Sequence, residues 1–294
     1  MKGTVKGTVG RWEWPTLVVA AVIYGLFAAL TLYHAALPWW LLLLAGGYVT
    51  AWHGSLQHEV VHGHPTPHAA LNEALVFPGL WLWLPFRRYR ESHLRHHYTP
   101  VITDPLDDPE SFYLSAGEWV RLNPVWKGFY LFHNTLAGRM TIGPAVAVFR
   151  LIRDEVARIA GGDRSALLAW MLHAAGCALV LGWAVGVCGM GVLEYVAYFA
   201  YPGLSLTLLR SFAEHQASND PEERTAMVRS GPLMSLLFLN NNLHSVHHSE
   251  PAMAWYRLPD RARQIRDAGY EFRGYGEIAA RHLLKPKEPV GFPL

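Results

Sequence analysis

The strongest constraint in this sequence is a stretch of 40 residues, positions 16–55, that contains no Asp, Glu, Lys or Arg. About 20 apolar residues are enough for one α-helix to cross the hydrocarbon core of a bilayer. Pro38 divides the stretch, and Trp39 and Trp40 beside it are typical of a membrane interface. Two spans, over residues 15–37 and 39–57, are therefore predicted to form a hairpin.

A second stretch, residues 165–209, has Glu194 as its single charged residue. It is interrupted by a glycine-rich segment, which predicts a second hairpin with spans over residues 165–187 and 191–212. Neither of the short loops that join paired spans contains any of the 25 Lys and Arg residues. Because positive charge is retained on the cytoplasmic side, both termini and the central loop are expected in the cytoplasm.

Composition agrees with a membrane protein: 51% of residues are hydrophobic and 16% are charged, against about 25% charged in soluble domains. We expect an all-α integral membrane protein, a single domain over residues 1–294, with four transmembrane helices in two hairpins. Residues 58–164 and 213–294 would form a cytoplasmic helical cap. Residues 74–86 are a possible fifth span, but Pro78 favours a re-entrant or interfacial element.

Nine of the 16 histidines fall into four groups, and the arrangement HxxHH occurs twice. Two copies are too many for chance at this histidine frequency. The groups are His58 with His62, His93 with His96 and His97, His215 alone, and His244 with His247 and His248.

Histidines three or four residues apart project from one face of a helix and can reach one metal ion, while an adjacent histidine reaches sideways toward a second. All four groups follow a predicted span or lie in a predicted cytoplasmic segment. Pattern and topology together predict a histidine-rich site for two metal ions on the cytoplasmic side of the membrane.

The three boxes on four predicted spans resemble those of the membrane fatty acid desaturase and hydroxylase superfamily, over residues of about 40 to 260. The resemblance implies that the eight box histidines and His215 bind two non-haem iron ions, with O2 as co-substrate. The run of asparagines at 240–242 and the segment 255–259 are similar to those of bacterial lipid and hydrocarbon oxygenases.

Neutral imidazoles can hold iron and leave positions open for oxygen, and two iron ions can share the electrons that cleave O2. The expected activity is hydroxylation or desaturation of an unactivated C–H bond in a lipid, acyl chain or other hydrophobic substrate. No separate side-chain acid or base is assigned. The narrow first box and the residues around the last box favour hydroxylation, and Ser211 stands where acyl-CoA desaturases carry asparagine, which argues against an acyl-CoA desaturase. A fatty acyl desaturase proper and a carotenoid hydroxylase or ketolase are the alternatives.

Two interpretations come from other classes of protein. A membrane metal carrier would use the histidines as transport ligands, but it needs polar residues along the spans, and these offer chiefly Thr, Ser and Glu194. A zinc hydrolase would use the pattern H-E-x-x-H, which begins at His58 and ends at His62. It would leave both HxxHH boxes without a role.

Ligating histidines usually donate their second N–H to a carboxylate, a carbonyl or water. Candidates for such partners are acidic residues that follow the second box or adjoin a histidine of a group: Asp104, Asp108, Glu59 and Glu214. Turn formation by the Asp-Pro pairs competes with that role for the first two. His64, close to the first box, is interpreted as a partner of a ligand or a surface residue.

Electrons must come from another protein, because the sequence has no dinucleotide-binding motif, no C-x-x-C pair and no haem domain. A ferredoxin- or rubredoxin-type donor is expected. The sequence has no run of basic and aromatic residues that would indicate binding to nucleic acid. The expected location is the bacterial inner membrane, with the metal site facing the cytoplasm.

Overall fold

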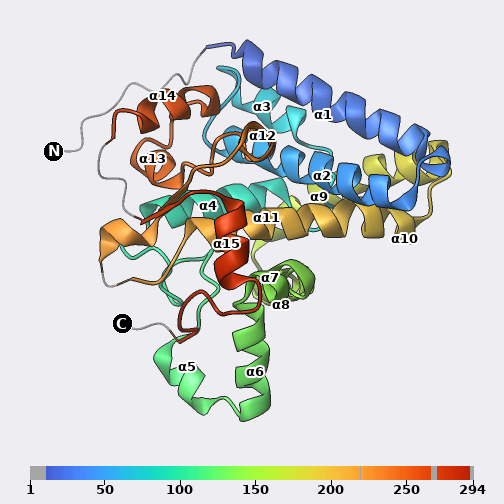
Figure 1. Ribbon diagram of the computed structural model, residues 1–294. Helices are drawn as coiled ribbons and strands as arrows, with labels where there is room; N and C mark the ends of the chain where they lie inside the picture. The colour runs from blue at the N-terminus through green and yellow to red at the C-terminus, as the bar shows by residue number, and fades with distance from the viewer. Residues whose placement is uncertain (1–10, 219, 266–269, 292–294) are drawn as a thin grey trace. The chain divides into compact units, whose positions relative to one another are not determined.

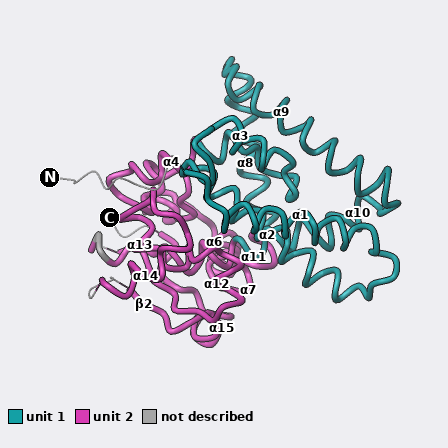
Figure 2. The backbone as a smooth tube through the Cα atoms, turned by 90° about the horizontal axis from the view of Figure 1, so that it is seen from above, with its two compact units in different colours: residues 1–90, 144–207 teal, residues 91–143, 208–294 magenta. Residues whose placement is uncertain are grey.

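The computed structural model describes residues 11–218, 220–265 and 270–291. It is 66% helical, with few strands, and Figure 1 shows the course of the helices. The chain divides into two compact units, each built from two separate stretches, as Figure 2 shows in two colours. The first unit is Met1–Arg90 with Pro144–Thr207, and the second is Glu91–Gly143 with Leu208–Leu294.

The first unit contains the long apolar helices together with shorter elements. Its elements are α1 (Trp14–Leu32), η1 (His34–Ala36), α2 (Trp39–Val61), α3 (Ala69–Leu75), α8 (Gly143–Ala160), α9 (Arg164–Leu181), η2 (Gly182–Val187), α10 (Val192–Tyr195) and η3 (Val196–Ala200), with the first turns of α4 (Phe86–Tyr98) and α11 (Tyr201–Glu214).

Three helical stretches are long and apolar enough to cross a membrane: Trp14–Leu32, Arg164–Val187 and Val192–Glu214. They match the spans predicted over 15–37, 165–187 and 191–212. On α1, the exposed residues Val18, Val22 and Leu26 lie four positions apart and form one stripe. Such an exposed apolar stripe suits contact with lipid chains rather than with water.

The helix α2 is not apolar enough to count among these candidate spans in the described part of the chain. Every residue from Val49 to Val61 is buried, including the polar His53, Ser55 and Gln57. A helix half surrounded by protein does not need an apolar surface, which explains its lower hydropathy. Of the four predicted spans, the one over residues 39–57 therefore stays a prediction.

Two glycines allow α2 to approach its neighbours closely. A Cβ atom at Gly46 would lie 2.5 Å from the carbonyl oxygen of Tyr198, and one at Gly47 would lie 2.8 Å from the Cβ of Pro202. Small residues at helix contacts are typical of membrane bundles, because they let backbones pack directly. They bring α2 against η3 and the start of α11.

Residues 76–85 form turns, with no helix between α3 and α4. The phenolic hydroxyl of Tyr195 donates to the carbonyl oxygen of Leu80 at 2.6 Å and ties the segment to α10. A helical fifth span over 74–86 is therefore absent, in agreement with the preferred non-spanning interpretation.

A buried ion pair fixes the start of α4. Arg88 Nε donates to a carboxylate oxygen of Glu155 at 3.0 Å, and Trp170 Nε1 donates to the other oxygen at 3.0 Å. Because Glu155 lies on α8 and Trp170 on α9, the first turn of the helix that carries the second histidine box is held by two neighbouring helices.

The second unit consists of short elements. They are α5 (Ala116–Arg121), α6 (Pro124–His133), α7 (Leu136–Thr141), η4 (Pro221–Arg224), β1 (Ala226–Val228), α12 (Pro232–Leu237), α13 (His244–Ser249), η5 (Trp255–Arg257), α14 (Leu258–Ala262), β2 (Tyr270–Phe272) and α15 (Tyr275–His282), with the rest of α4 and α11. The strands β1 and β2 pair in parallel.

Short helices need local caps, because their first N–H groups have no partner within the helix. Ser115 and Glu118 form a capping box at α5, and the side chains of Asn123 and Thr135 accept backbone N–H groups at the starts of α6 and α7. A small core centred on Met227, Val246 and Leu258 supports β1 and α13.

Candidate metal centre

The helix α4 carries the second histidine box on two faces. His93 and His97 are four residues apart, and their Nε2 atoms are 3.1 Å from each other. His96 lies between them in sequence and turns toward a different group of histidines. The predicted division of an HxxHH box between two sites is therefore present in the second unit.

The third box forms the short helix α13, which begins at His244. His247 faces α4, with its Nε2 3.1 Å from that of His97. We call His93, His97 and His247 the three-histidine cluster. His93 and His247 are each 2% exposed, so their imidazoles are shielded from solvent.

Four further histidines of the second unit form a four-histidine cluster: His96, His215, His244 and His248. The Nε2 of His244 lies 2.9 Å from that of His215 and 3.0 Å from that of His248, and His248 lies 3.3 Å from His96 between the same atoms. His215 follows the last residue of α11, which brings a residue distant in sequence from both boxes into the cluster.

In the first unit, His58 and His62 lie at the end of α2, the latter at its C-cap. Their ring centroids are 4.9 Å apart, so the two imidazoles share one face of the helix as the spacing predicts. His58 is 1% exposed.

Two carboxylates determine which ring nitrogen faces inward. His96 Nδ1 lies 2.8 Å from Asp108, and His93 Nδ1 lies 3.1 Å from Glu110. An ionised carboxylate can only accept, so each Nδ1 carries the hydrogen and each Nε2 presents a lone pair to its cluster. Buried lone pairs that face one another repel, and a cation at the centre removes that repulsion.

The distances between the nitrogens also fit a metal ion. Two imidazole nitrogens bound at about 2.1 Å from one metal lie about 3.0 Å apart at a right angle and about 3.4 Å apart in a tetrahedron. The nearest Nε2 pairs in the two clusters are 2.9 to 3.3 Å apart, and all ligand atoms within a cluster lie within 4.8 Å of one another. Neutral imidazoles suit iron, zinc, copper or nickel rather than calcium or magnesium.

Burial keeps most of these imidazoles neutral. It lowers the pKa of His93, His215, His244 and His248 well below the ordinary value of 6.5, and neighbouring histidines lower it further. For His96, burial also lowers the pKa, but the hydrogen bond to Asp108 and nearby carboxylates outweigh it and raise the pKa overall. Neutral imidazole is the form that ligates metal.

The predicted partners of the ligands divide into two kinds. Asp108 contacts His96 as described, and a carboxylate oxygen of Glu214 lies 3.5 Å from Nδ1 of His244. Glu59 lies 3.9 Å from Nδ1 of His58. Asp104 instead accepts the backbone N–H groups of Leu106 and Asp107, which is turn formation.

Sequence reasoning overlooked one partner and misjudged a neighbour. Glu110 was not singled out, although it follows the second box in the same acidic segment as Asp108. His64 is 1% exposed, with its Nδ1 2.6 Å from Glu13 Oε1, so the surface interpretation is wrong. Glu13 lies far away in sequence, and no local pattern indicated the contact.

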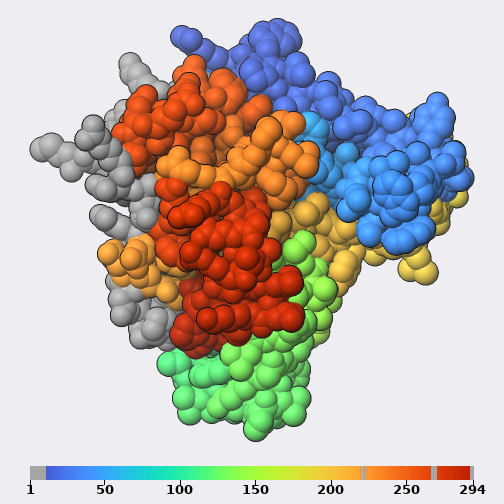
Figure 3. All heavy atoms as spheres, in the orientation of Figure 1, coloured from blue at the N-terminus to red at the C-terminus, as the bar shows by residue number. Residues whose placement is uncertain are grey.

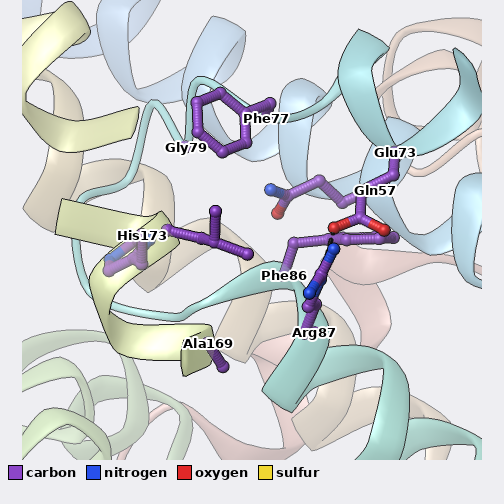
Figure 4. A pocket seen from close by; sticks show the side chains of 9 residues that line it. Gln57, Glu73, Phe77, Gly79, Phe86, Arg87, Ala169 and His173 are labelled. Atoms are coloured by element: carbon purple, nitrogen blue, oxygen red, sulfur yellow. Dashed lines mark hydrogen bonds and ion pairs between the residues drawn. The ribbon is translucent and has the colours of Figure 1, made fainter. Parts of the chain in front are cut away.

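A pocket in the first unit is lined by Gln57, the residue before His58 in sequence (Figure 4). Gln57 reaches into it from α2, with Glu73 and Arg87 on the same side and His173 opposite. Its apolar lining is Phe77, Phe86, Ala169 and Leu172. The Gln57 amide nitrogen donates to the carbonyl oxygen of Val76, and its Oε1 is buried without a partner among the described residues.

Apolar helices that can cross a membrane, together with buried groups of converging imidazoles, define a membrane metalloprotein. The family model for fatty acid desaturases matches residues 34–277 of this chain. The chain therefore belongs to the fatty acid desaturase family. No protein with a curated description matches it significantly. Membership makes it a membrane oxidoreductase of the desaturase and hydroxylase type, with a lipid substrate, a redox partner and a histidine-rich metal site consistent with non-haem iron.

Proposed function

We propose that this protein is an O2-dependent diiron oxygenase that hydroxylates or desaturates an unactivated C–H bond of a lipid, acyl chain or other hydrophobic substrate. The observation that carries the proposal is the pair of buried clusters in which imidazole nitrogens converge at 2.9 to 3.3 Å. When bound, two iron ions would supply the electrons and the open positions needed to activate O2.

The proposed ligands of the two iron ions are nine histidines. The three-histidine and four-histidine clusters supply seven of them, and His58 and His62 are assigned to the same centre on the resemblance of the first box to the family pattern. The complete set is His58, His62, His93, His96, His97, His215, His244, His247 and His248.

The protein's own groups would orient the ligands and exclude water. Asp108 and Glu110 hold the hydrogen on Nδ1 of His96 and His93, so that each Nε2 carries the lone pair that would bind metal. Glu214 and Glu59 are proposed to support His244 and His58 in the same way, whereas Asp104 shapes the loop around Asp108. No separate side-chain acid or base is assigned.

The membrane arrangement that we propose has four spans. They are the three apolar candidates and the helix α2. Residues 58–164 and 213–294 would form the cytoplasmic cap of a single domain, in a bacterial inner membrane. The absence of Lys and Arg from the loops at 38 and 188–191 supports this orientation. A ferredoxin- or rubredoxin-type protein would deliver electrons from the cytoplasm.

Within the family we favour the branch of bacterial lipid and hydrocarbon oxygenases. Hydroxylation is placed ahead of desaturation because the first box is narrow. Ser211, one turn before His215, stands where acyl-CoA desaturases carry asparagine. A fatty acyl desaturase proper and a carotenoid hydroxylase or ketolase are the competing assignments within the family.

Metal and product analysis test the proposal. We expect the detergent-purified protein to hold two iron ions per chain, with Mössbauer parameters of nitrogen-rich coordination in an isotopically enriched sample. With an electron donor and lipid extract, ¹⁸O2 should label the product if it is an alcohol, and a product two hydrogens lighter without label would indicate desaturation. One zinc ion per chain would instead support a hydrolase, and metal that washes out would support a carrier.

We further expect the pocket that contains Gln57 to contact the substrate, since Gln57 is the residue before His58 and Phe77, Phe86, Ala169 and Leu172 give the pocket an apolar side. Leu172→Trp should fill part of the pocket and lower turnover by about tenfold or more, because substrate misplacement by an ångström is enough for such a loss. Iron content should not change. Leu168→Trp, on the same helix but outside the pocket and 49% exposed, is the matched control. Equal turnover in both variants would place the substrate elsewhere.

A further inference from the structure

Lys287 lies beyond the part of the chain that matches the family model, which ends at residue 277. Its side chain is 3% exposed. Lysine is rarely buried to this extent unless partners satisfy its ammonium group, because desolvation of a charge is costly. A buried lysine therefore indicates a specific task for its three N–H donors.

Two of those donors reach the end of α11. Lys287 Nζ donates to the carbonyl oxygen of Phe212 at 2.8 Å and to that of His215 at 2.6 Å. The last carbonyl groups of a helix have no partner within it, and the C-terminal end carries partial negative charge. One ammonium group thus joins the final turn of α11 to the histidine that follows it.

The segment around Lys287 is held on both sides. The Lys287 backbone N–H donates to the carbonyl oxygen of Asn134 at 3.1 Å, and the Asn134 side chain donates to the carbonyl oxygen of Glu288 at 2.7 Å. The Glu288 carboxylate accepts the hydroxyl of Tyr113 and, at 2.9 Å, the backbone N–H of Ala217. Ala217 lies two residues after His215, so the segment holds the chain on both sides of that histidine.

Other contacts join the C-terminal residues to the same part of the second unit. The Ala137 N–H donates to the carbonyl oxygen of Leu283 at 2.9 Å, and α15 packs against α7. In Figure 3 the red C-terminal residues lie directly beside the green residues of α6 and α7. The segment is therefore anchored and can act as a support.

His215 needs such a support more than the other histidines of its cluster. His96 lies within α4, and His244 and His248 share α13, so helix geometry sets their spacing. His215 lies just after a helix and must still place its Nε2 2.9 Å from that of His244. We propose that Lys287 is a positioning residue that fixes His215 as a metal ligand, an inference that rests on the proposed metal-binding role of the four-histidine cluster.

The test uses cobalt(II), because its visible absorption reports coordination whichever metal the protein holds in the cell. Cobalt(II) is titrated into the metal-free full chain in detergent, for the native sequence, Lys287→Met and Lys285→Met. Met keeps the volume of the buried side chain and removes its donors. We expect Lys287→Met to weaken one cobalt site by about 10- to 100-fold, the range for residues that orient a ligand. Lys285, which is exposed, should have no effect.

A double-variant cycle separates positioning from general destabilisation. In a His215→Ala background, Lys287→Met should cause no further loss of cobalt affinity, because it acts through His215. The same loss in both backgrounds, or unchanged affinity in the single variant, would overturn the inference. If Lys287→Met does not fold, Glu288→Gln provides the same cycle, with an expected loss of several-fold that again disappears without His215.

The outcome is distinguishable from failure of the proposed function. A native protein that binds cobalt at the clusters but contains zinc, or shows no oxygenase activity, would refute the diiron oxygenase and leave the coupling between Lys287 and His215 measurable. A native protein that binds no cobalt would refute both.

Discussion

Replacing His96 by alanine is expected to abolish turnover and to reduce bound metal. His96 is 1% exposed, its Nδ1 is held by Asp108 and its Nε2 faces His248, so the truncation removes a proposed ligand and one hydrogen-bond donor of a buried carboxylate. Because residues that merely orient a ligand contribute 10- to 100-fold, loss of a ligand should cost more than about 100-fold in activity. Iron content and turnover of the purified variant are the measurements.

His68→Ala is the matched control, since it removes an exposed histidine that belongs to no box and lies at the start of α3. Among the described residues, the one aromatic ring that its imidazole contacts is that of Trp12, edge-on. Iron content and turnover should both equal those of the native protein. If the two variants behave alike, the assignment of the histidine groups as metal ligands is wrong.

Replacing Asp108 by alanine should lower activity or metal affinity by about 10- to 100-fold. Asp108 is 5% exposed, and its carboxylate binds Nδ1 of His96 as well as the backbone N–H groups of Thr103 and Glu110. Its loss frees the His96 ring to rotate or to change tautomer. A stepwise iron titration of the metal-free protein, followed by a turnover assay at saturating iron, separates weaker binding from slower chemistry.

Asp104→Ala is the appropriate comparison, because Asp104 lies in the same loop and also accepts backbone N–H groups, but bonds Leu106 and Asp107 instead of a histidine. It should alter the loop with less than about threefold loss of metal affinity, given the usual small effect of substitutions outside the core. A larger effect for Asp104 than for Asp108 would mean that loop shape, rather than support of His96, controls the site.

The apolar helices were predictable because a bilayer imposes a simple requirement on local sequence. A long charge-free stretch has few alternatives to a membrane helix, and three of the predicted spans match candidate spans. The helix α2 was harder to judge, since its second half is buried by protein and can carry His53, Ser55 and Gln57. Hydropathy alone does not distinguish burial by protein from burial in lipid.

The histidine boxes were predictable for a similar reason, since histidines three or four residues apart on one helix lie on the same face. Asp108 and Glu214 were also among the expected partners, but other contacts of the histidines were not predictable. Glu110, Glu13 and Lys287 reach their histidines from loops, from the start of α1 and from the C-terminal segment. Such contacts depend on how distant segments pack, and no short-range periodicity records them.

The sequence by itself therefore determined the class of protein, since helical membrane spans and metal ligation both depend on residues that are close together along the chain. Only the tertiary structure decided which histidines of the second unit form the three-histidine and the four-histidine cluster, and that Asp108 contacts His96 whereas Asp104 shapes a turn. The physical reason is that ligand convergence, burial and hydrogen-bond partners are set by distances between segments far apart in sequence.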